Sequence, residues 1–274
     1  MKLIECLHTE SRCWKYKGGD GYYPARPIGV LLHTTGANNT TLKRYCQPSK
    51  DDPNREELLK TIGKNKYNNH WNRNITKAVH YFIGKLEDGS IATVHNIPLD
   101  YSAWGVGKGK KGSYNYNPTA YIQFEICEDS KTNYDYFNAT KNEAVELCVE
   151  LCRQFGWSSK NITSHNEARL AGYASSHLDP TTWWKNFGYT MDDFRKEVQD
   201  ILDGGTPREI VVGSVIEFVG TKQYTNSNKL IPKAATPCIA TVKRIYKLGK
   251  SRHPYLVKGK GVNGWVDAND VRLI

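Results

Sequence analysis

The sequence contains no apolar run that approaches the ~20 residues needed to cross a membrane. Its first residues, MKLIECLHTESRC, carry a charge at Glu5 and no apolar stretch of signal-peptide length. We therefore expect no membrane insertion and no export through a signal peptide, so a target outside the membrane requires another route of delivery. Internal repeats and low-complexity tracts are also absent, and the composition is that of a globular chain.

Redox and metal motifs of the Cys-x-x-Cys type are missing, although the chain contains seven cysteines. Cys148 and Cys152 lie four positions apart in AVELCVELCRQF, a pattern that predicts a helix on which they share one face. A buried helix face explains this pair more simply than a redox or metal role. We expect reduced thiols and synthesis in a reducing cytoplasm.

The first 206 residues have almost no net positive charge, because their 26 Lys and Arg are nearly balanced by 24 Asp and Glu. From Pro207 onward the count is 12 against 4, so a net of +8 out of +10 belongs to this last part. Such a surface suits a polyanionic partner, which includes nucleic acid, an anionic membrane and an anionic cell-wall polymer.

A domain boundary is predicted at DGGTPRE, because two glycines and a proline end the amphipathic helical run TMDDFRKEVQDIL. We place a first domain at residues 1–203, a linker at 204–209 and a second domain at 210–274. The second domain consists of short β-rich segments separated by Gly, Asn and Pro turns, which favours a small all-β barrel or sandwich.

The first domain interleaves strands and helices, which predicts an α/β fold with a mixed central sheet flanked by helices. PIGVLLHTT and YIQFEIC are predicted strands, and AVHYFIGKLEDGSIATVHNI is a predicted hairpin that turns at Asp88-Gly89. KNEAVELCVELCRQFG is predicted to be a helix that ends at Gly156.

Three candidate metal ligands stand at separate places along the first domain. His33 ends the apolar strand, at the sheet edge where open α/β folds place ligands, and His165 follows the β-like NITS. Asp179 lies fourteen residues after His165. Two imidazoles and a carboxylate suit zinc with an open fourth position for water, as a hydrolytic site requires. The alternative is that His33 is a structural histidine at a strand end. The spacing alone does not establish a metal site, because these ligands lie far apart in the sequence, unlike those of an HExxH motif.

Two further side chains extend this hypothesis. In YIQFEIC, strand alternation puts Gln123 and Glu125 on one face, and a buried glutamate there is costly unless it is paired or functional. Glu125 is therefore a candidate general base, or alternatively a solvated group on an edge strand. His177 could assist an oxyanion, or could be the third ligand with Asp179 orienting it.

Taken together, GVLLHTTG, VHYFIGKLEDGSI, AWGVG, YIQFEI and ITSHNEA…SSHLDP resemble the zinc-dependent N-acetylmuramoyl-L-alanine amidases of the phage-lysozyme and peptidoglycan-recognition type. The resemblance covers roughly residues 25 to 200. It implies cleavage of the amide between N-acetylmuramic acid and the L-Ala of the stem peptide. The resemblance implies that His33, His165 and Asp179 bind the zinc ion. It also implies that Glu125 is the general base and that His177 stabilises the oxyanion.

The sequence departs from this family at two positions. Val79 stands where some members have a catalytic tyrosine, and Gly105 in AWGVG stands where many have a substrate-site histidine. Trp104 and His80 stay as candidate substrate-binding residues, with core packing as the alternative for the tryptophan.

The C-terminal segment resembles the bacterial SH3-like wall-binding modules of clostridial phage endolysins and autolysins. It implies aromatic wall contacts from Tyr224 and Tyr255, and also from Phe218 and Trp265 unless these two are core residues. Such an enzyme waits in the cytoplasm and reaches the wall after release, through a holin if it is phage-encoded. The expected partners are peptidoglycan and an anionic wall polymer.

Two other functional classes are open to test. The first is a non-catalytic peptidoglycan-binding protein on the same fold. Such a protein needs neither a full ligand set nor a base, so the presence of both in this sequence argues against this class. Nucleic-acid binding through the basic segment lacks a recognisable reading motif, so we expect no nucleic-acid partner. The sequence leaves the oligomeric state open.

Overall fold

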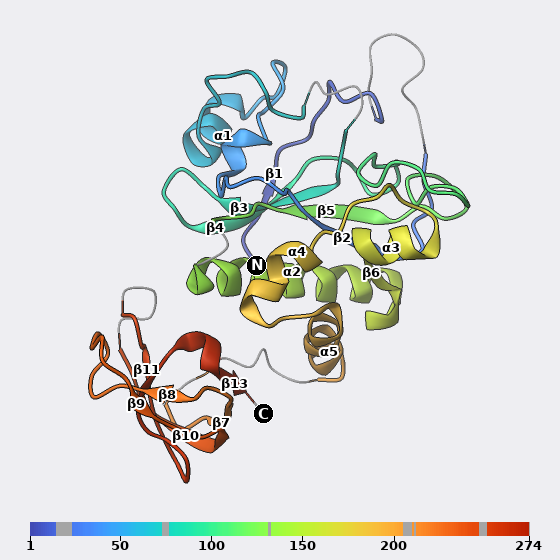
Figure 1. Ribbon diagram of the computed structural model, residues 1–274. Coiled ribbons are helices and arrows are strands. Elements are labelled where there is room, and N and C mark those ends of the chain that lie inside the picture. Colours follow the sequence, from blue (N-terminus) through green and yellow to red (C-terminus); the bar gives the residue numbers. More distant parts are fainter. Residues whose placement is uncertain are drawn as a thin grey trace. The chain divides into compact units, whose positions relative to one another are not determined.

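The computed structural model describes residues 1–14, 24–72, 77–130, 133–204, 210, 212–246 and 251–273. The chain divides into two compact units, Met1–Gly204 and Gly205–Ile274 (Figure 1). The linker that the sequence predicts at residues 204–209 lies outside the described residues except for Gly204.

The first unit is built on a six-stranded mixed sheet with the order β1-β4-β3-β5-β2-β6. Its strands are β1 (Leu3–Glu5), β2 (Val30–Thr34), β3 (Tyr81–Lys85), β4 (Ile91–His95), β5 (Ile122–Ile126) and β6 (Ile162–Ser164). The neighbours β3, β5, β2 and β6 run parallel, whereas β3 and β4 form the antiparallel hairpin predicted around Asp88-Gly89. Gly89 has a φ of +83°, which its lack of a Cβ allows.

Helices cover both faces of this sheet (Figure 1). They are α1 (Arg55–Ile62), α2 (Tyr134–Phe155), α3 (His165–Ala171), α4 (Thr181–Trp184) and α5 (Met191–Leu202). Short 3-10 turns lie at Leu42–Arg44, Ser159–Asn161 and Lys185–Phe187. The α/β class expected from the sequence, a mixed central sheet flanked by helices, is therefore confirmed.

The main core lies between one face of the sheet and the helices α2 and α5, because the apolar positions of all three meet there. It includes Ile122 and Phe124 of β5, Cys148 and Cys152 of α2, and Phe194 of α5. The cysteine pair thus occupies a buried helix face, as the simpler interpretation of the sequence required. On the opposite face of the sheet a second cluster packs under α1, and here β5 turns Gln123 and Glu125 inward.

The helix α2 is longer than the sequence pattern predicts. It ends before Gly156, which adopts the left-handed conformation at φ +68°, as expected. It begins at Tyr134, however, where the Asn133 side chain caps it by accepting a hydrogen bond from the Tyr136 N–H. The added first turns are held by tertiary packing of Tyr136 and Phe137 in the main core.

The second unit is all-antiparallel β, which confirms the other half of the expected fold class. A five-stranded sheet has the order β12-β11-β10-β7-β13, beside the two-stranded pair β8-β9. The strands are β7 (Val215–Phe218), β8 (Lys222–Gln223), β9 (Lys233–Ala234), β10 (Cys238–Ile245), β11 (Tyr255–Gly259), β12 (Asn263–Val266) and β13 (Val271–Leu273), with a 3-10 turn at Ala268–Asp270. Alternating residues of these strands form a separate core that contains Phe218, Val242 and Tyr255.

Within the described residues, no helix combines the length and the apolar character that a membrane span requires.

Candidate active site

The strand register brings the two histidines together at one end of the sheet. In the parallel pair β2 and β6, Leu32 lies opposite Ser164, so the next pair along the strands is His33 and His165. His165 is the first residue of α3, whose start is fixed by a capping box between Ser164 and Glu167. The strand-to-helix junction therefore places His165 beside His33 without an intervening loop.

Asp179 reaches the same point from the segment before α4. The Asn166 N–H donates to the Asp179 carbonyl at 3.1 Å, which ties this segment to α3. On its other side, the Trp183 indole N–H donates to the Asp129 carboxylate at 3.0 Å, which links α4 to the residues after β5. The carboxylate of Asp179 is thereby held at the carboxyl ends of the central strands.

The three side chains converge on one point through His33 Nδ1, His165 Nδ1 and the Asp179 carboxylate oxygens. The two Nδ1 atoms are 3.0 Å apart, and they lie 3.2 and 3.4 Å from carboxylate oxygens of Asp179. Ligands of a tetrahedral zinc ion at ordinary bond lengths lie about 3.3 Å from one another. The donor types and spacing fit a zinc ion, and this triad forms a group able to hold a metal.

Electrostatics in the triad follow from burial of the rings next to a carboxylate. Burial lowers the pKa of His33, but the hydrogen bond with Asp179 and the charge of Glu125 outweigh it, so the net direction is upward. The pKa of His165 falls to about 4, because of burial and of repulsion from His33. Burial raises the pKa of Asp179, yet the two histidines bring it below its usual value.

Glu125 lies next to this group on β5, where the register places it opposite His33. Burial raises the pKa of its carboxyl to about 8, despite the opposing effect of His33. Among the residues that the structure describes, its buried Oε2 has no hydrogen-bond partner. A glutamate with a raised pKa and a free oxygen near a metal-binding triad suits proton transfer.

His177 stands at the open side of the triad. Its side chain is 69% exposed, its ring stacks on His165 with centroids 4.9 Å apart, and its Nδ1 lies 4.0 Å from Asp179. That separation exceeds a hydrogen bond. The triad therefore consists of His33, His165 and Asp179, and His177 faces outward beside it.

The other residues that the sequence singled out have different surroundings. His80 is buried and both of its ring nitrogens are bonded within the protein, to the Tyr101 carbonyl and the Gln123 N–H. Trp104 is half-buried against a small cluster that includes Ala78 and Ile97. Val79 is buried in the cluster beneath α1.

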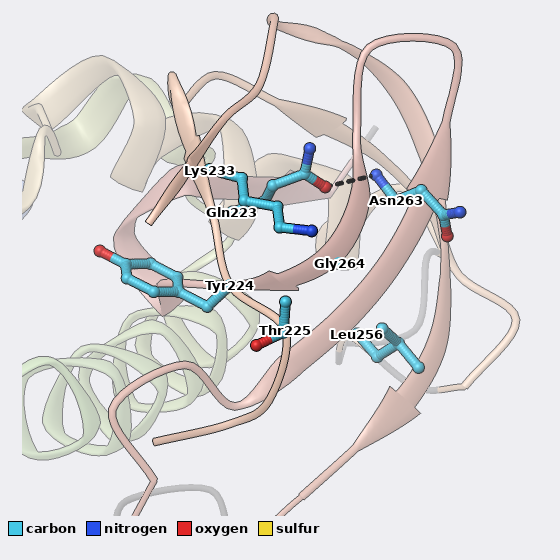
Figure 2. Close-up of a pocket in the computed structure, with 7 residues that line it drawn as sticks. All are labelled: Gln223, Tyr224, Thr225, Lys233, Leu256, Asn263 and Gly264. Atoms are coloured by element: carbon cyan, nitrogen blue, oxygen red, sulfur yellow. Dashed lines mark hydrogen bonds between the residues drawn. The ribbon is translucent and has the colours of Figure 1, made fainter. Parts of the chain in front are cut away.

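In the second unit, Tyr224 and Tyr255 have different surroundings. Tyr255 is buried in the core, whereas Tyr224 lines a pocket of about 410 Å³. Figure 2 shows the Tyr224 ring at one side of this pocket and the hydrogen bond from Asn263 N to Gln223 Oε1 at another. Phe218 is buried, and Trp265 is half-buried.

One polar residue of the site has no role in the sequence-based hypothesis. Gln123 is fully buried, and its Oε1 lies 3.2 Å from His33 Nε2. The signal that could have found it is the one that selected Glu125, namely a polar residue within an apolar central strand.

In comparisons with known proteins, residues 23–182 match the family model described as N-acetylmuramoyl-L-alanine amidase. Among solved structures, the Staphylococcus aureus hydrolase AmiA in complex with its ligand is 18% identical, with a TM-score of 0.48 over 76% of this chain and 88% of that chain. PlyL is 17% identical, with a TM-score of 0.45 over 76% of this chain and 99% of that chain. A mutant endolysin from Bacillus subtilis is 18% identical, with a TM-score of 0.46 over 72% of this chain and 99% of that chain. The comparison with curated proteins gave no match.

Proposed function

The chain belongs to the N-acetylmuramoyl-L-alanine amidase family, and we propose that it hydrolyses the amide between N-acetylmuramic acid and the L-Ala of the stem peptide with the help of zinc. The observation that carries this proposal is the convergence of His33, His165 and Asp179 at spacings of 3.0 to 3.4 Å. Glu125 beside them supports an enzyme over a binding protein, because binding alone needs no buried base.

Zinc would be held by the Nδ1 atoms of His33 and His165 and by the Asp179 carboxylate, and would supply Lewis acidity toward the scissile carbonyl and toward water. In the proposed reaction Glu125 accepts a proton from the attacking water and returns it to the leaving nitrogen of L-Ala. Its burial and its unpartnered Oε2 support this role. His177, exposed beside the triad, donates a hydrogen bond toward the developing oxyanion. Trp104 is proposed to contact the substrate. His80 is proposed to support the site from its buried position, through its hydrogen bonds with Tyr101 and Gln123.

The second unit, assigned to residues 210–274 with the catalytic domain at 1–203, is proposed to be an SH3-like domain that binds an anionic wall polymer. Its pocket offers the face of Tyr224, the ammonium group of Lys233 and the amide of Asn263. The Tyr224 ring is braced from behind by His253, with stacked ring centroids 3.4 Å apart. His253 is fixed by hydrogen bonds with the Asp267 carboxylate and the Lys229 carbonyl. Tyr255 supports this unit from its core.

Domain order and composition together support a role as a phage endolysin or an autolysin that acts on the wall after release from the cytoplasm. The decisive experiment is mass spectrometry of digested peptidoglycan, which distinguishes amide cleavage from cleavage of glycan or cross-bridge bonds. Activity is expected to disappear with a zinc chelator and to return with zinc. Wall binding with no new amino termini under any metal condition would favour the non-catalytic binding protein instead.

A further inference from the structure

We propose that Gln123 is a positioning residue that sets which nitrogen of His33 faces the metal site. Its side-chain oxygen accepts a hydrogen bond from His33 Nε2, and this leaves Nδ1 as the ring atom able to bind a metal. The inference rests on the zinc site proposed above, but it concerns a residue that is not itself a ligand.

The orientation of the Gln123 amide is dictated by backbone groups. The Gly105 N–H can only donate, and it points at Gln123 Oε1 at 3.0 Å, so the atom there is the oxygen. At the other end, Gln123 Nε2 donates to Asn115 Oδ1 at 3.0 Å, and that oxygen also accepts from the Val106 N–H at 3.3 Å. Two backbone donors therefore fix both amides in one arrangement.

That arrangement determines the proton on His33. Gln123 Oε1 lies 3.2 Å from His33 Nε2 and has no hydrogen to donate, so Nε2 must carry the proton. The lone pair of the neutral ring is then on Nδ1, the atom that points toward His165 and Asp179. A metal-binding histidine commonly has its other ring nitrogen held in this way.

Gln123 is itself held firmly by His80, the residue directly before β3. The His80 N–H donates to the Gln123 carbonyl, and the Gln123 N–H donates to His80 Nδ1, each at 2.9 Å. His80 Nε2 donates in turn to the Tyr101 carbonyl at 2.9 Å. Burial lowers the pKa of His80 to about 4, so its neutral ring accepts at Nδ1 and donates at Nε2. His80 thus supports the residue that orients His33.

Gly105 is the counterpart of Gln123 in this packing. A Cβ atom at position 105 would lie 2.4 Å from Gln123 Oε1 and 3.0 Å from His33 Nε2. The absence of a side chain lets the Gly105 backbone approach the amide closely enough to donate to it. The amide of Gln123 therefore fills the space that a side chain at position 105 would occupy.

The second histidine is held less specifically. His165 Nε2 lies 3.1 Å from the Ser175 hydroxyl, which either donates or accepts, so this contact alone does not determine the ring proton. Of the two contacts at the Nε2 atoms, the one between His33 and Gln123 has a direction fixed by its acceptor, and the one between His165 and Ser175 does not, so the Gln123 contact is the one to test.

The test compares Gln123→Leu with a matched control in the full-length protein. Gln47→Leu removes another buried glutamine of the first unit, one that bonds to the Gly63 carbonyl and the Asn65 N–H, outside the site. Zinc affinity, measured by competition with a chelator, is expected to weaken by about 10- to 100-fold in Gln123→Leu and to stay at the wild-type value in Gln47→Leu. Thermal unfolding of both variants measures the general cost of losing a buried amide.

Ring-nitrogen NMR of the metal-free protein provides the second measurement, which does not depend on zinc binding. A hydrogen-bonded proton is expected on His33 Nε2 in the wild type and in Gln47→Leu, and is expected to be lost in Gln123→Leu. Zinc affinity of Gln123→Leu within twofold of the wild type, or a wild-type His33 protonated at Nδ1 alone, would overturn the inference. A wild type that shows the Nε2 proton yet binds no zinc would contradict the proposed function and leave the orientation of His33 by Gln123 supported.

Discussion

At the scale of single residues, Glu125 combines a cost in stability with the proposed role as a general base. Its pKa of about 8, against an ordinary value of 4.5, means that the folded protein keeps a proton that the unfolded chain releases in this range. The folded state binds more protons, so the free energy of unfolding falls as pH rises from 4.5 to about 8.

Replacement of Glu125 by glutamine should therefore separate stability from turnover. In chelator-treated protein, Glu125→Gln is expected to raise the melting temperature at the upper end of that pH range and to change it little at the lower end. The same variant should bind zinc with near wild-type affinity and lose turnover on cell walls. A stability difference that is equal at both ends, or turnover near the wild-type rate, would contradict the assignment.

Asp179 and His177 are distinguished by their distances from the triad. Asp179→Asn is expected to lose zinc, because the carboxylate lies 3.2 to 3.4 Å from both Nδ1 atoms. His177→Ala is expected to keep zinc and to lower turnover about 100-fold, the usual effect of removing one oxyanion donor. Metal analysis of the two purified variants checks this, and the reverse pattern would make His177 the third ligand.

At the scale of elements, the junction of β6 with α3 connects helix capping to the proposed metal site. The Ser164 hydroxyl caps α3 by accepting from the Glu167 N–H, and the next residue is His165. Ser164→Ala is expected to cost about 1 kcal/mol of unfolding free energy and to weaken zinc binding as well, because the ring follows the helix start.

A capping box of the same kind starts α5, with Thr190 accepting from the Asp193 N–H. Thr190→Ala therefore serves as the control, with a similar loss of stability in denaturant unfolding and unchanged zinc affinity. Equal zinc affinity in both alanine variants would show that the β6-α3 junction does not position His165.

Most regular elements that position the site could be predicted, because their apolar residues repeat with the period of a strand or a helix. The hairpin, β2, β5 and α5 follow from such patterns, and the parallel register then brings His33 toward His165. The first turns of α2 could not be predicted from periodicity, because tertiary burial of Tyr136 and Phe137 stabilises them. The proposed role of Gln123 could not be predicted either, because its partners Gly105, Asn115 and His33 are brought together only by the fold.

Tyr255 shows a related limit of sequence patterns. Alternation along a strand shows that its residues have two faces, but it does not tell which face of a small β unit is covered. The structure buries Tyr255 and leaves Tyr224 beside the pocket, although both aromatic residues are candidates for wall contacts in the sequence.

At the scale of the whole molecule, the candidate active site lies in the first unit and most of the net positive charge in the second, and each unit has a core of its own. From Pro207 onward the chain carries 12 basic against 4 acidic residues, whereas the earlier part is nearly balanced. Attraction to an anionic polymer weakens with ionic strength, because salt at 0.1 M largely screens exposed charges that lie more than about 10 Å apart.

Wall binding by residues 205–274 is therefore expected to fall steeply as salt is added, as measured by sedimentation with purified walls. Hydrolysis of a soluble peptidoglycan fragment by residues 1–204 should change little over the same salt range and serves as the control. Binding that ignores salt, or that is displaced by competing DNA, would argue against an anionic wall polymer as the partner.

The proposed ligands are spread over 146 positions of the chain, from His33 to Asp179. A nascent polypeptide consequently has no complete metal pocket until Asp179 has left the ribosome and the parallel strands have paired. Capture of the proposed zinc ion would then be among the last events of folding and would stabilise only the finished protein. A chain whose synthesis has not passed Asp179 would therefore lack one of the three proposed ligands and could not carry out the proposed hydrolysis.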